Sequence, residues 1–83
     1  MPVVITAEAA RQIDALPLTI RARLAGVLER LARWPDVSGA KPLKGNLAGH
    51  YRVRTGDYRV QFHLSGDDVV VEKVGHRDGF YDK

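Results

Sequence analysis

The segment HYRVRTGDYRVQFH, residues 50–63, contains three arginines and two histidines but only one acidic residue, Asp57. Apolar and polar residues alternate on either side of Gly56 and Asp57, which is the pattern of a β-hairpin. The polar face of this hairpin would carry Arg52, Arg54, Arg59, Gln61 and His63. Guanidinium groups held side by side repel one another unless an anion joins them. The segment therefore predicts either an anion-binding face or a solvated face that resists aggregation.

Net positive charge is concentrated in the same part of the chain. The 83 residues have a formal net charge of +3. Residues 41–63 alone hold five cations against one acid, a net charge of +4. The five are Lys41, Lys44, Arg52, Arg54 and Arg59. A basic cluster of this kind attracts polyanions, nucleic acid first among them.

Length and composition exclude several classes of protein. A chain of 83 residues predicts a single domain, 1–83. The chain has no cysteine, which excludes disulfides, thiolate zinc sites and a cysteine nucleophile. Asp67 and Asp68 mark a turn rather than a metal site, because two adjacent aspartates give poor ligand spacing. No secretory signal and no membrane-spanning run is evident. We therefore expect a cytoplasmic protein without cofactor, metal or membrane association.

The other elements predict an α+β fold. PVVIT, residues 2–6, is β-branched and predicts a first strand, after which Thr6 can cap a helix. Pro17 ends that helix, and a second should run from about residue 18 to 33, with an apolar stripe. The stripe comprises Ile20, Leu24, Val27, Leu28 and Leu31. Residues 36–49 are rich in turn formers and predict a loop, followed by an antiparallel meander of three strands. On the hairpin, the core-facing residues would be Tyr51, Val53, Tyr58, Val60, Phe62 and Leu64.

Four short motifs, in order, carry a resemblance to a known family. They are L-K-G at 43–45, Y-R-V-R at 51–54, G-D-Y-R-V at 56–60 and V-G-H-R-x-x-x-Y at 74–81. With the helical hairpin before them, they resemble the RelE toxins of the RelE/ParE superfamily from bacterial type II toxin–antitoxin pairs. The resemblance implies two helices against an antiparallel-dominated sheet. It also implies cleavage of mRNA in the ribosomal A site without a metal, by attack of the ribose 2′-hydroxyl on its own phosphate.

The resemblance also implies which residues act. It places Arg54, Arg59, Arg77 and Tyr81 in the catalytic site, where fixed guanidinium groups stabilise the charge of the reacting phosphate. His76 is added because an arginine is a poor general base, whereas a histidine can exchange protons near neutral pH. Arg52, Lys41 and Lys44 would contact the RNA backbone. His50 and His63 are expected to be solvated or to fill the polar face.

Partners and alternatives follow from the same resemblance. The expected partners are a cognate antitoxin, in a hetero-oligomer, and the ribosome with its mRNA. One alternative is a ParE-like poison of DNA gyrase without nuclease chemistry, since the superfamily shares one fold. A further alternative is an inactive relic that still binds an antitoxin, because Gly79 could loosen the segment between Arg77 and Tyr81. The complete set of arginines and Tyr81 favours the nuclease.

Overall fold

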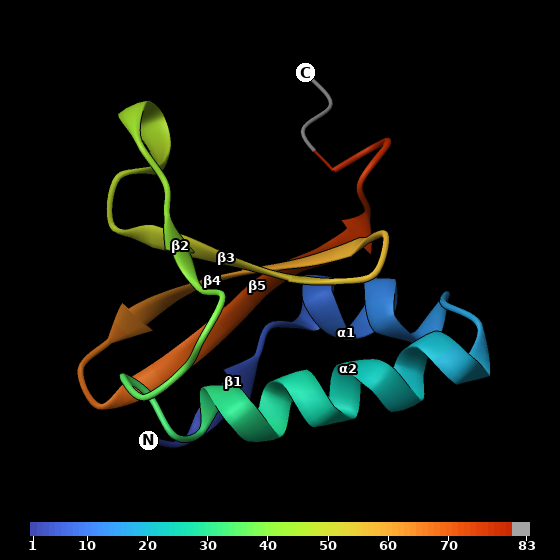
Figure 1. Ribbon diagram of the computed structural model, residues 1–83, viewed down its shortest axis with the longest axis horizontal. Coiled ribbons are helices and arrows are strands. Elements are labelled where there is room, and N and C mark those ends of the chain that lie inside the picture. The colour runs from blue at the N-terminus through green and yellow to red at the C-terminus, as the bar shows by residue number, and fades with distance from the viewer. Residues whose placement is uncertain (81–83) are drawn as a thin grey trace.

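Two helices cover one side of a five-stranded sheet. The computed structural model describes residues 1–80, with the strand order β1-β5-β4-β3-β2. The elements are β1 (Val3–Ile5), α1 (Ala7–Asp14), α2 (Leu18–Leu31), β2 (Lys41–Pro42), the 3-10 turn η1 (Gly45–Leu47), β3 (His50–Thr55), β4 (Tyr58–Ser65) and β5 (Asp68–His76). β1 pairs with β5 in parallel, and the other strand pairs are antiparallel. Figure 1 shows the helices below the sheet and the C-terminal segment above it. The predicted α+β fold with its C-terminal meander is confirmed.

Local sequence explains where the helices begin and end. The side-chain oxygen of Thr6 accepts a hydrogen bond of 3.1 Å from the backbone N–H of Ala9, so the predicted N-cap of α1 is confirmed. Pro17 stands directly before α2, where its missing N–H removes no intrahelical bond. The chain turns away soon after α2, before Pro35.

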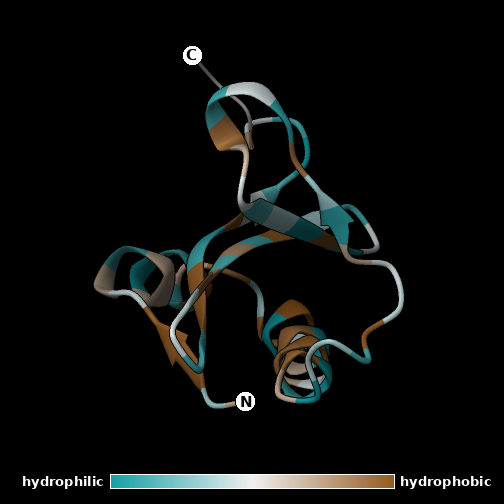
Figure 2. Cartoon of the chain, turned by 90° about the vertical axis from the view of Figure 1, so that its left-hand side faces the viewer, coloured by the Kyte–Doolittle hydropathy of each residue, from teal (hydrophilic) through white to brown (hydrophobic). Residues whose placement is uncertain are grey.

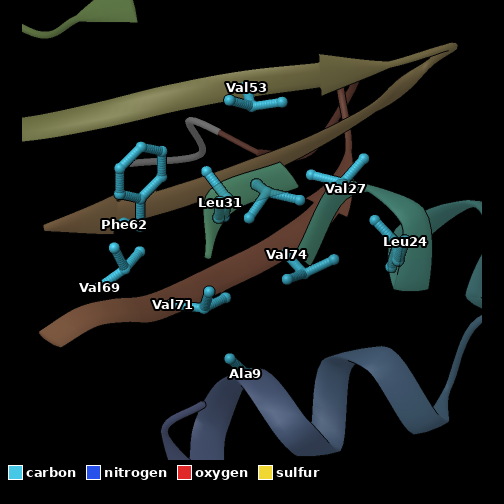
Figure 3. Close-up of a cluster of buried hydrophobic side chains, with 10 residues drawn as sticks. Ala9, Leu24, Val27, Leu31, Val53, Phe62, Val69, Val71 and Val74 are labelled. Carbon is cyan, nitrogen blue, oxygen red and sulfur yellow. The ribbon is translucent and has the colours of Figure 1, made fainter. Parts of the chain in front are cut away.

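The core lies between the helices and one face of the sheet. Leu24, Val27 and Leu31 of α2 are each at most 3% exposed, and Ala9 of α1 is fully buried. Figure 3 shows these side chains facing valines of β3 and β5 and Phe62 of β4. α1 packs mainly against β5 and α2 against β3, so both helices contribute to one cluster. The predicted stripe of α2 is thus the core-facing stripe.

Aromatic contacts close the core at one end. The Trp34 ring packs edge-on against Tyr51 and Phe62, with centroids 4.9 and 5.5 Å apart. Trp34 therefore joins the end of α2 to the sheet. Leu64 was expected on this core face, but it is 36% exposed. It is the last residue but one of β4, next to the turn to β5, although its cross-strand partner Val69 is fully buried.

Two short elements interrupt the predicted loop of residues 36–49. β2 is only two residues long, and it pairs Lys41 with Arg52 on the edge of β3. η1 follows almost at once, from Gly45 to Leu47. A two-residue edge strand containing a proline has no periodicity from which it could be predicted. Its consequence is that Lys41 becomes a neighbour of the arginines of the hairpin.

β1 forms the opposite edge of the sheet. It is the hydrophobic arrow near the N-terminus in Figure 2, and Val4 and Ile5 on it are 43% and 39% exposed. The prediction of a strand at PVVIT is confirmed. Among residues 1–80, no helix is both long enough and apolar enough to cross a membrane.

Candidate active site

The side of the sheet turned away from the helices, called the open face below, carries the basic hairpin. Across β3 and β4, Arg54 lies opposite Arg59, and Arg52 lies opposite Gln61. These residues alternate with buried ones, Val53 and Val60 among them, so they point away from the core. The predicted division of the hairpin into an apolar face and a basic face is confirmed. The guanidinium groups of Arg54 and Arg59 are therefore cross-strand neighbours.

The end of the sheet at the turn between β3 and β4 gathers four of the five predicted catalytic residues. Arg59 pairs with Gly75 of β5, and the next residue on β5 is His76, whose ring packs edge-on against Tyr58 at 5.2 Å. Arg77 follows, and its backbone N–H donates a 2.8 Å hydrogen bond to the carbonyl of Asp57 in the hairpin turn. Arg54, Arg59, His76 and Arg77 therefore lie at one end of the sheet. Arg54 and Arg59 belong to the open face, whereas His76 lies with Tyr58 and Val74 on the helix side. Tyr81 lies outside the described residues.

The side chain of Arg77 is 58% exposed and has only loose acidic neighbours. Its Nε lies 3.6 Å from a carboxylate oxygen of Asp78 and 4.0 Å from one of Asp57. Ion pairs as exposed as these contribute little to stability. The guanidinium group can therefore exchange these carboxylates for a phosphate at small energetic cost.

His76 is held by its own turn. The backbone N–H of Asp78 donates to His76 Nδ1 at 3.2 Å, which requires a lone pair on that nitrogen. Asp78 Oδ2 lies 3.5 Å from the same nitrogen, so a proton on Nδ1 would face a carboxylate. The two contacts with Asp78 therefore fit different tautomers of the ring.

The segment after β5 folds back over the open face. Phe80 is only 1% exposed, and a Cβ added to Gly75 would lie 3.5 Å from its ring. The ammonium of Lys73 lies 4.6 Å from the centre of the Phe80 ring and donates to the Phe80 carbonyl. The Gly79 N–H bonds to the carbonyl of His76 at 3.2 Å. Gly79 was expected to loosen this segment, but it lies in a hydrogen-bonded turn that Phe80 anchors.

The residues predicted to bind RNA lie along the other edge of the basic face. β2 places Lys41 directly beside Arg52, and Lys44 is exposed in the residue before η1. The structure therefore brings Lys41 and Arg52 together, while Lys44 stands further along the chain. The cations extend from the turn end of the hairpin to the β2 edge.

The sequence analysis missed an acidic residue on the open face. Glu72 of β5 accepts hydrogen bonds from His50, from His63 at 2.7 Å and from Gln61 at 2.8 Å. His50 was expected to be solvated, but it is half-buried against this carboxylate. Burial alone would raise the pKa of Glu72, but the hydrogen bonds from Gln61, His50 and His63 outweigh it and lower that pKa. Glu72 is therefore an ionised carboxylate at neutral pH.

A β-bulge explains why Glu72 lies there. β4 pairs Gln61 with Lys73 but Phe62 with Val71, so Glu72 is an extra residue in β5. The bulge shifts the alternation, and Val74 rather than Lys73 enters the core. The signal in the sequence was the pair of adjacent charged residues, Glu72 and Lys73, inside an otherwise alternating run of valines.

Comparisons with known proteins agree on one group of relatives. The sequence model of the family described as the ParE toxin of the type II toxin–antitoxin system parDE matches residues 3–79. The chain is 28% identical over 76 residues to Toxin RelE3 of Methanocaldococcus jannaschii, covering 87% of this chain and 85% of the relative.

Solved structures show the same fold. In the toxin–antitoxin complex RelBE2 from Mycobacterium tuberculosis, the matching chain is 33% identical, with a TM-score of 0.81. The match covers 92% of this chain and 96% of that one. The RelB–RelE antitoxin–toxin complex from Methanococcus jannaschii matches with a TM-score of 0.79 at 24% identity, over 95% of each chain.

Proposed function

The chain belongs to the RelE/ParE superfamily of type II toxin–antitoxin toxins, and from this premise we propose that it is a ribosome-dependent mRNA endoribonuclease. The observation that carries the proposal is the gathering of Arg54, Arg59 and Arg77 at the end of the sheet where β3 turns into β4. Guanidinium groups at fixed positions suit a reaction in which negative charge grows on a phosphate.

The proposed reaction requires no metal at the phosphate. The ribose 2′-hydroxyl attacks the adjacent phosphorus, and the bond to the 5′-oxygen of the next nucleotide breaks, leaving a 2′,3′-cyclic phosphate and a 5′-hydroxyl. Arg59 and Arg77 hold the non-bridging oxygens, with Arg54 beside them. His76, at the same end of the sheet, exchanges protons with the 2′-hydroxyl or the departing oxygen. Tyr81 stacks on a base or takes part in the proton transfer.

The proposed partners are of two kinds. Arg52, Lys41 and Lys44 bind the phosphate backbone of the mRNA or of the ribosome, acting in the cytoplasm. A cognate antitoxin binds the toxin and neutralises it, which is supported by the related chains solved as toxin–antitoxin complexes. The acidic or amphipathic segments of such a partner would complement the basic open face.

A second candidate function is poisoning of DNA gyrase by binding alone. The match to a family described by the name ParE favours it. The gathering of arginines at one end of the sheet favours the nuclease, because gyrase binding alone needs no phosphoryl-transfer site.

One experiment separates the two functions. The toxin is expressed briefly in a bacterium, and primer extension across a translated message is run beside a supercoiling assay with purified gyrase. The nuclease predicts new 5′ ends within translated codons and unaffected supercoiling. Loss of supercoiling without new 5′ ends would replace the nuclease by the gyrase poison, and folded protein without either effect would identify an inactive relic.

A further inference from the structure

Three adjacent strands of the sheet bring two imidazoles and a carboxylate to one point of the open face. His50 of β3 lies opposite His63 of β4, with ring centroids 5.3 Å apart, and Glu72 of β5 lies between the two rings. One potential ligand atom from each residue lies within 4.8 Å of the other two. The side chains are 31%, 34% and 19% exposed, so the cluster is partly sheltered and reachable from solvent.

This cluster is separate from the proposed catalytic end. His50 and Arg54 are four positions apart on β3, which corresponds to roughly 13 Å along an extended strand. The phosphate chemistry proposed above therefore does not account for it. The hydrogen bonds described for its carboxylate come from Gln61 and the two histidines.

We propose that His50, His63 and Glu72 form a binding site for a divalent transition-metal ion of the Zn²⁺ type. Two imidazole nitrogens and one carboxylate oxygen are a donor set that Zn²⁺, Co²⁺ and Ni²⁺ accept, whereas Mg²⁺ and Ca²⁺ prefer oxygen donors throughout. In a tetrahedral zinc site the ligand atoms are about 3.3 Å apart, given bonds of about 2.0–2.1 Å. Small side-chain rotations bring the cluster from its present spacing to that geometry.

Gln61 is the positioning residue of this site. It is 7% exposed and donates to Glu72 Oε2 at 2.8 Å, which fixes the carboxylate on the side of the histidines. Hydrogen bonds of this kind, one step removed from the metal, orient the ligands of protein metal sites. When the ion binds, it replaces the direct hydrogen bonds between Glu72 and the two imidazole rings. The hydrogen bond from Gln61 to Glu72 is kept.

Three protein ligands leave one position of a tetrahedral ion open toward solvent. A water molecule or a phosphate oxygen can occupy it. The ion also changes the charge of the open face, because Glu72 with two neutral histidines carries −1 and the same cluster with a divalent ion carries +1. The metal would thereby join β3, β4 and β5 and extend the basic surface away from the arginines.

The test is direct metal binding to the purified full-length chain, without ribosomes or RNA. Zn²⁺ is titrated in competition with a chromophoric chelator, and Co²⁺ is added separately to record its visible d–d absorption. We expect one ion per chain, a Co²⁺ spectrum of low coordination number, and no competition from millimolar Mg²⁺. Shifts of the imidazole resonances of His50 and His63, but not of His76, should accompany Zn²⁺ binding in the unaltered protein.

Variants assign the ion to this cluster. The double variant His50→Gln/His63→Gln should lose more Zn²⁺ affinity than the roughly 10–100-fold typical of losing a group that only orients a ligand. Gln61→Ala should fall within that smaller range. His76→Gln removes the third histidine of the chain and should bind Zn²⁺ like the parent. Circular dichroism verifies that each variant is folded.

Three results would overturn the proposal. They are the absence of one-to-one Zn²⁺ or Co²⁺ binding at micromolar concentration, equal binding by the folded double variant, and shifts confined to His76. In each case Glu72 would serve only to hydrogen-bond the two histidines. The metal titration needs no ribosome, so its result is independent of the nuclease assay. Either proposal can therefore fail while the other is confirmed.

Discussion

Arg77 lies on a turn, and its side chain contributes nothing to the core. Replacing it by alanine should therefore remove a charge from the reacting phosphate while the fold persists. We expect Arg77→Ala to lower the rate of mRNA cleavage by roughly a hundredfold or more, the loss typical of removing one fixed donor from a developing charge. Primer extension measures the cleavage of mRNA, and growth arrest measures toxicity. Arg21→Ala, an exposed arginine of α2 on the opposite side of the sheet, is the matched control.

The proposed role of Tyr81 is either stacking on a base or proton transfer. Tyr81→Ala should abolish most cleavage under either role. Tyr81→Phe separates them, because phenylalanine keeps the ring and lacks the hydroxyl. If Tyr81 stacks on a base, the Phe variant keeps most of its activity; if Tyr81 transfers a proton, the Phe variant behaves like the Ala variant. Folded Tyr81→Ala and Arg77→Ala proteins that still arrest growth as strongly as the parent would refute the nuclease.

Residue types revealed the basic face, but not all of its neighbours. Arg54 and Arg59 could be placed opposite each other because a strand alternates with period two and the hairpin turn at Gly56 sets the register. Glu72 could not be placed, because one extra residue in β5 changes which side chains point outward. Contacts between residues as distant as His50 and Glu72 depend on that register.

Among the elements, the segment from Gly75 to Phe80 connects the fold to the proposed catalytic residue Arg77. Phe80 packs on Gly75 and Lys73, apart from the cluster between the helices and the sheet. Phe80→Ala should therefore release the segment that carries Arg77 and reduce cleavage nearly as much as Arg77→Ala.

The effect of Phe80→Ala on stability should be smaller than that of a core substitution. Phe62→Ala, within the main cluster, should lower the free energy of unfolding by about 3–5 kcal/mol. Urea denaturation compares the two variants. Phe80→Leu keeps an apolar contact and should retain most activity. A Phe80→Ala protein as active as the parent would show that Phe80 is not needed to hold the segment that carries Arg77.

Elements with a clear period were predictable, and short ones were not. The stripe of α2 and the alternation of β3 and β4 each extend over several turns or pairs, and the structure agrees with them. β2 is too short to have a period, and it forms only because β3 offers a free edge. Leu64 continues the alternation of β4 but stands beside the turn to β5, where it is 36% exposed. The period of a strand predicts which face a residue occupies, but not how deeply it is buried.

At the scale of the whole molecule, the open face should bind naked RNA weakly and mainly through charge. If five cations contact phosphates of a single strand, the slope of log K against log salt concentration should be about −3.5. Removing Arg52 should reduce the magnitude of that slope by about 0.7. Fluorescence anisotropy with a labelled oligonucleotide measures both. Efficient cleavage of this RNA without ribosomes would contradict the proposed dependence on the ribosome.

A cognate antitoxin should cover the basic face or its rim. We expect the product of the adjacent gene to co-purify with the toxin and to abolish both RNA binding and growth arrest. Charge reversal of two exposed residues, Arg54→Glu with Lys41→Glu, should weaken the complex, whereas Arg21→Glu on the helical side should not. Absence of a complex at micromolar concentration would remove the antitoxin from the proposal.

The parallel pairing of β1 with β5 has a consequence for the nascent chain. Val3 of β1 pairs with Val69 of β5, which is far along the sequence. The contact order of this strand pair is therefore high, and the long segment between the two strands must be ordered before they can pair. During synthesis β1 must wait, unpaired, until residues 69–71 have emerged from the ribosome. Arg77 is made later still. We therefore expect a growing chain to be harmless to the ribosome that makes it until both β5 and Arg77 have emerged.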